Sequence, residues 1–231
     1  MLNIYKITAY MGIIVILMSF CLFSIFPSRP ANLDKKGMFT PIIIFEFAQT
    51  FEDINMLFGT EDSLERRNFI RSMDLGNWLD FIYMIMYSCF LACFCYACIE
   101  NTGLKLFKIC LAITPIIFLG DLFENIQLLG ITQKISTKDF ASELIYLQVF
   151  TWIKWGGLCI FSLLLSLYFI KGSLFSKIIG INGITCFILG ICSFFYPSVI
   201  NEIFTISIAF LFMLLIIYCF FINKIAPNRL Y

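Results

Sequence analysis

The sequence contains no histidine among its 231 residues. Histidine is the commonest general base and metal ligand at neutral pH, so its absence excludes Ser-His-Asp triads, Cys-His nucleophiles and metal sites held by histidine. Charged residues are also scarce, at 13% of the chain. The net charge of +1 gives no electrostatic basis for binding nucleic acid. We therefore predict no cofactor, no metal site and no nucleic-acid partner.

Apolar side chains are abundant instead, forming 61% of the chain and including 28 phenylalanines. A soluble protein cannot cover such a surface with polar groups, so the sequence indicates an integral membrane protein. The ten cysteines lie almost wholly within apolar runs, where cysteine behaves as a small hydrophobic residue. Cys95 and Cys98 form one CxxC motif, and one such motif in a cysteine-rich helix does not establish redox or metal chemistry.

Six apolar runs each approach the roughly 20 residues that a bilayer requires. They cover residues 7–26, 78–99, 109–129, 145–170, 178–196 and 203–222. The first run follows a lysine, as in a signal peptide, but no small-residue cleavage site follows it, so we expect a retained helix. Because a backbone in lipid must satisfy its own hydrogen bonds, and the runs lack the alternation of a barrel, we predict an all-α bundle of about six transmembrane helices. It should form a single domain over residues 1–231.

A long polar interval at residues 27–77 is predicted to contain two further helices. The Thr40-Pro41 pair suits a helix start, because threonine caps and proline fits the first helical position. Polar residues then recur on one face, which predicts one amphipathic helix at about residues 41–58, interfacial or partly inserted. A charged helix at about residues 61–71 should be solvated or lie at the level of the lipid headgroups.

Basic residues of the short loops and tails concentrate on the side of the termini, which six spans place together. They are Lys6, Lys105, Lys108, Lys171, Lys177, Lys224 and Arg229. Lys134 and Lys138 lie on the opposite side, with the mixed-charge long loop. The positive-inside rule therefore predicts that both termini are cytoplasmic.

Ionisable residues gather in one half of the predicted bilayer. By the helical rise, Glu124 lies about 10 Å from the long-loop side, whereas Asp121 and Lys154 both lie about 14 Å from it. Asp80 lies nearer to the same side. Asp121, Glu124 and Asn125 share a helix face at i, i+3 and i+4. A lone charge at the bilayer centre costs about 2.5–3.5 kcal/mol on insertion scales, so Lys154 is the expected counter-charge.

We predict that these residues and the amphipathic helix form a polar pocket that opens toward the long-loop side. Its members are Glu46, Asp80, Asp121, Glu124, Asn125 and Lys154. The pocket would bind or transport an ion, a proton or the polar head of an amphiphilic small molecule or membrane lipid. The excess of acids over bases implies either protonated carboxyl groups or room for a bound cation.

Three other interpretations stay open. The polar residues could form a satisfied network that only fixes helix register. The chain could be a structural subunit whose exposed phenylalanine and isoleucine faces dock onto a partner membrane protein or a second copy. A carboxylate-based intramembrane enzyme would use Asp80 and Asp121 as an aspartyl pair. However, Phe118 stands where the Gly-x-Gly-Asp signature of aspartyl intramembrane proteases has its first glycine.

Short segments of the chain resemble a group of uncharacterised bacterial multi-pass membrane proteins. The matching residues are Glu46-Phe47-Ala48-Gln49-Thr50, Asp74 through Asp80-Phe81, Asp121-x-x-Glu124-Asn125, and Lys154 in the following span. Phe47 departs from the leucine that is usual in the first segment. The resemblance supports the choice of site residues, and it implies no activity. We expect the protein to lie in a bacterial inner membrane.

Overall fold

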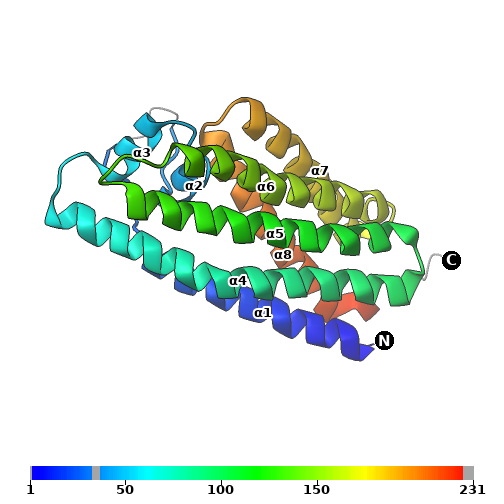
Figure 1. Cartoon of the computed structure of the whole chain (residues 1–231). Coiled ribbons are helices and arrows are strands. Elements are labelled where there is room, and N and C mark those ends of the chain that lie inside the picture. The colour runs from blue at the N-terminus through cyan, green and yellow to red at the C-terminus, as the bar shows by residue number, and fades with distance from the viewer. Residues whose placement is uncertain (1, 33–36, 226–231) are drawn as a thin grey trace.

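Helices form all of the regular secondary structure in the computed structural model, which describes residues 2–32 and 37–225 (Figure 1). The helices are α1 (Leu2–Ile25), α2 (Pro41–Glu46), α3 (Phe51–Phe58), α4 (Leu64–Thr102), α5 (Lys105–Lys134), α6 (Ala141–Phe169), α7 (Leu174–Phe195) and α8 (Val199–Ile225). The predicted all-α fold is confirmed.

Six helices in the described part of the chain, α1 and α4 to α8, are long and apolar enough to cross a bilayer. They correspond one to one with the six predicted spans. The longest is α4, with 39 residues. Its length of about 58 Å exceeds a hydrocarbon core of about 30 Å, so one end must project beyond the membrane.

The charged helix predicted at about residues 61–71 is not a separate element. It belongs to α4, which runs without a break from Leu64 to Thr102. Ser63 caps the start of α4 by accepting a hydrogen bond from the backbone N–H of Arg66 at 3.1 Å. Nothing interrupts α4 afterwards, because this stretch has no proline, and its one glycine, Gly76, packs against the ring of Phe26. The exposed first turns of a spanning helix therefore carry these charges.

The single amphipathic helix predicted at residues 41–58 is also corrected, because the structure divides it into α2 and α3. The break at residues 47–50 is stabilised by a capping box. The Thr50 hydroxyl accepts from the backbone N–H of Asp53 at 3.1 Å, and the Asp53 carboxylate accepts from that of Thr50 at 3.0 Å. This reciprocal pair begins a new helix inside the predicted one.

The six long helices form a closed bundle in which each packs against its neighbours. The packed pairs are α1 with α4, α4 with α5, α5 with α6, α6 with α7, α7 with α8, and α8 with α1. The short helices α2 and α3 lie at the end of the bundle opposite to the start of α1 (Figure 1). From there α2 contacts both α5 and α6, which places Glu46 against the bundle.

Small residues allow the long helices to approach closely where the polar residues lie. Gly120 of α5 faces the backbone of α6, and a Cβ at this position would lie 2.6 Å from the backbone nitrogen of Lys154. Glycine is enriched at such interfaces because it lets two membrane helices approach closely. Gly120 thus determines how near Asp121, the next residue, comes to Lys154.

Replacing Gly120 by alanine should lower the melting temperature of the purified protein in mild detergent. The added methyl group would push α5 from α6, and overpacking of this kind costs about 1–3 kcal/mol. Gly156→Ala in α6 is the matched control, because no atom lies within 4 Å of a Cβ there. Both changes raise helix propensity equally, so the difference between their melting temperatures isolates the effect of the contact between α5 and α6. Equal melting temperatures would contradict the proposed close approach.

Candidate functional site

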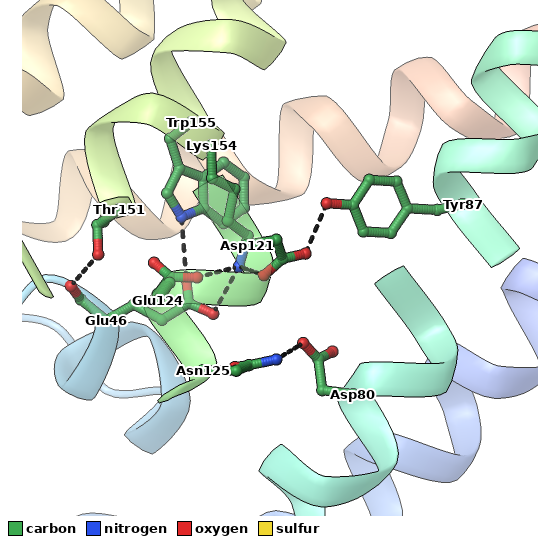
Figure 2. Close-up of polar contacts among 9 residues, drawn as sticks. All are labelled: Glu46, Asp80, Tyr87, Asp121, Glu124, Asn125, Thr151, Lys154 and Trp155. Carbon is green, nitrogen blue, oxygen red and sulfur yellow. Dashed lines mark hydrogen bonds and ion pairs between the residues drawn. The ribbon is translucent and has the colours of Figure 1, made fainter. Parts of the chain in front are cut away.

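The ammonium group of Lys154, on α6, lies at the centre of a buried charged cluster (Figure 2). Its Nζ atom lies 2.6 Å from Glu124 Oε2, 2.9 Å from Asp121 Oδ1 and 3.1 Å from Glu46 Oε1. All four side chains are buried, and Glu124 has no exposed surface. The three carboxylates therefore match the three N–H groups that a lysine ammonium can offer.

The geometry of α5 and α6 explains why these groups meet. Asp121 and Glu124 are three residues apart on α5, so both side chains face α6. Lys154 lies about 20 Å along α6 from its start at Ala141, well inside the bundle. The ion pair that sequence depth predicted between Asp121 and Lys154 is present. A role of these residues in binding stays a prediction.

Glu46 is the last residue of α2, and it joins the cluster because both its backbone and its side chain bind α6. The Glu46 backbone carbonyl accepts a hydrogen bond from the Thr151 hydroxyl at 3.0 Å, and its Oε2 accepts from Trp155 Nε1 at 2.9 Å. In the break after α2, the backbone carbonyl of Gln49 accepts a third hydrogen bond from Gln148 Nε2 at 3.1 Å. Burial raises the pKa of the Glu46 carboxyl, and the nearby charge of Lys154 opposes that rise.

A second set of contacts links α4 to the same face of α5. The Tyr87 hydroxyl donates to Asp121 Oδ2 at 2.5 Å, and the Asn125 amide donates to Asp80 Oδ2 at 2.6 Å. Asp80 and Asn125 thus lie beside the Lys154 cluster without pairing with the ammonium. The partners of Asp80 and Asp121 differ from those in an aspartyl protease, where two carboxyl groups share one proton.

Glu202, in the first turn of α8, is a buried acid that the sequence interpretation missed. Its Oε1 accepts from the backbone N–H groups of Phe39 and Thr40 at 2.9 and 2.8 Å, and its Oε2 accepts from the Thr40 hydroxyl at 2.7 Å. Thr40 immediately precedes α2. Helix α2 is therefore held at its start by α8 and at its end by α6. The sequence did contain a signal for Glu202. With six spans, α8 starts on the same side of the membrane as the long loop, so an acid in the first turn of α8 can reach that loop.

A cavity of about 430 Å³ lies against the cluster. Its polar lining consists largely of Glu46, Asp80, Tyr83, Tyr87, Asp121 and Lys154. Apolar side chains from α1, the segment after it, α2, α6 and α8 form most of the remainder, including Phe23, Phe26, Ile43, Leu158, Ile208 and Phe212. The cavity therefore combines apolar walls with one charged region, which is the general pattern of small-molecule sites.

Replacing Lys154 by methionine should destabilise the protein strongly. The change leaves three carboxyl groups buried without their counter-charge, and losing one partner of a buried ion pair costs about 3–5 kcal/mol. Lys134→Met is the matched control, because Lys134 pairs with Glu143 at 2.6 Å near the surface. Thermal melting in detergent should show a large decrease for the first variant and little change for the second. Similar decreases in both would mean that the buried cluster stabilises the protein no more than the surface ion pair does.

Replacing Glu202 by glutamine should loosen the start of α2, because an amide cannot accept the same hydrogen bonds at both of its polar atoms. A hydrogen bond to a charged group contributes about 1.5–3 kcal/mol, so backbone amides around residues 39–40 should exchange deuterium at least about tenfold faster. Glu61→Gln is the control, because Glu61 is exposed. Unchanged exchange in Glu202→Gln would show that α2 is held by other contacts.

Comparisons of the chain with models of protein families, with curated proteins and with solved structures found no match. The family resemblance inferred from short segments thus stays a prediction.

Proposed function

We propose that this multi-pass membrane protein binds an amphiphilic small molecule or lipid in the cavity beside Lys154. The observation that carries the proposal is the position of the cavity, whose apolar walls border the side chains of Asp80 and Asp121. An amphiphile would place its tail along the apolar walls and its polar head at the charged region. Transport across the membrane would be an extension of such binding.

The dimensions and borders of the cavity support this proposal. Its volume of about 430 Å³ falls within the roughly 300–1,000 Å³ typical of ligand pockets. Phe23 and Phe39 border it and are 80% and 58% exposed. Because Phe23 lies on a helix long and apolar enough to cross a membrane, its exposed ring would face lipid. An apolar molecule could therefore enter from the membrane without crossing water.

The proposed location is the inner membrane of a bacterium, with both termini cytoplasmic. The start of α1, the α4–α5 connection and the α6–α7 connection lie at one end of the bundle (Figure 1). Lys6, Lys105, Lys108 and Lys171 belong to these segments, so the positive-inside rule supports a cytoplasmic position for that end. Arg229, which the sequence argument also used, lies outside the described residues.

Native mass spectrometry of the protein purified in mild detergent tests the proposal. Wild type should retain one bound amphiphile, whereas Ile208→Trp should bind it about tenfold more weakly, a loss of about 1.4 kcal/mol, because the larger ring fills the cavity. Ile206→Trp is the matched control, since Ile206 lies on the same helix, is 62% exposed and does not line the cavity. Melting curves would verify that both variants are folded.

The result also separates this proposal from the structural-subunit alternative. Equal retention of lipid by both variants would place the lipid on the outer surface and overturn the proposed site. A stoichiometric membrane protein that co-elutes with a lipid-free chain would favour the subunit instead.

A further inference from the structure

Accepting the proposed binding function, we propose that the amphiphile carries a cationic, N–H-bearing head such as a primary ammonium group, which pairs with Asp80 and Asp121. The apolar walls of the cavity would accept any apolar tail. The charged region decides the class of head, and four features of that region favour a cation.

The first feature is that the positive charge beside the cavity is already neutralised. Lys154 is the only cationic side chain among the described residues that line the cavity. Its ammonium lies within 3.1 Å of carboxylate oxygens from Glu46, Asp121 and Glu124. A phosphate or carboxylate head would have to displace one of these buried partners, which costs several kcal/mol for each charge left alone.

The second feature is that most of the other strong donors at the cavity are also occupied. The hydroxyl of Tyr83, which accepts from Ser19 Oγ at 3.1 Å, is an exception. The indole N–H of Trp155 donates to Glu46, and the hydroxyl of Tyr87 donates to Asp121. The hydroxyl of Thr40 donates to Glu202. An anionic head would therefore find few free hydrogen-bond donors among the residues around it.

The third feature is a shortage of donors for the carboxyl oxygens. Asp121 is 1% exposed and lines the cavity, and its Oδ1 has no hydrogen bond apart from the ion pair with Lys154. Buried acceptors in folded proteins are nearly always satisfied. Asp121 Oδ1 shares the Lys154 ammonium with two other carboxylates, so it can accept a further N–H group from the cavity.

The fourth feature is the position of Asp80 on the wall of the cavity. Its Oδ2 accepts from Asn125, whereas its Oδ1 accepts no hydrogen bond from the described residues. Asp80 is only partly buried, so a ligand can approach it. A primary ammonium brings one positive charge and three N–H donors, which fits both the charge excess and the unfilled acceptors. A quaternary ammonium brings the charge alone.

Four probes with the same ten-carbon chain test the inference: decylammonium, decyltrimethylammonium, decanol and decanoate. Each is added to the full-length protein in a neutral detergent, and the concentration that raises the melting temperature half-maximally is measured. Decylammonium should act at a concentration at least about tenfold lower than decanol. Decanoate should be weaker than decanol. Decyltrimethylammonium should lie between decylammonium and decanol, because it lacks N–H groups.

Asp80→Asn is the decisive variant, because the amide keeps the shape of the side chain and an acceptor for Asn125. It should reduce the preference for decylammonium over decanol at least about fivefold. Asp139→Asn is the matched control, since Asp139 is exposed in the α5–α6 loop, away from the residues that line the cavity. This control should keep the full preference.

The possible failures are distinguishable. Equal responses to all probes, each lost in Ile208→Trp, would overturn the cationic head and leave the proposed binding function standing. A stronger response to decanoate would do the same. If sodium or potassium chloride alone reproduced the stabilisation by decylammonium, the site would belong to an inorganic cation and the inference would be wrong. Absence of any response from wild type would overturn both proposals.

Discussion

The constraint on which the rest of the structure depends is the need to keep the Lys154 ammonium surrounded by carboxylates. A single charge buried in a low-dielectric interior costs several kcal/mol, and only close ion pairs with good geometry offset that cost. Because Asp121 and Glu124 come from α5 and Glu46 comes from α2, three segments must meet at one point. The close approach at Gly120 and the attachment of α2 both serve this requirement.

The attachment of α2 turns a connecting loop into part of the bundle. A backbone that leaves the helical conformation within a membrane protein must find partners for its polar groups. Here the carbonyls of Glu46 and Gln49 receive hydrogen bonds from Thr151 and Gln148 of α6. Glu202 supplies acceptors for the N–H groups ahead of α2. With both ends satisfied, the short helix can form one wall of the cavity.

The sequence predicted the fold and the Asp121–Lys154 ion pair because both follow from helix geometry. Span length gives the six long helices, and the rise per residue places Asp121 level with Lys154. The division between α2 and α3 was not predicted, since the polar face continues through it at helical spacing. Partners on α6, which no local pattern reveals, stabilise that break. Glu202 was missed because acids are common in first turns for a separate reason, the helix dipole.

A network that existed only to fix helix register would be expected to balance its donors and acceptors and to fill the space around it, because protein interiors are closely packed. The cluster departs from both expectations at the same place. The carboxyl groups of the cluster outnumber its one ammonium, and a cavity of about 430 Å³ borders Asp80 and Asp121. Structural and binding roles are compatible here: Lys154 holds the helices together, and the surplus of acceptors that remains is what would give the adjoining cavity the proposed preference for a positively charged group.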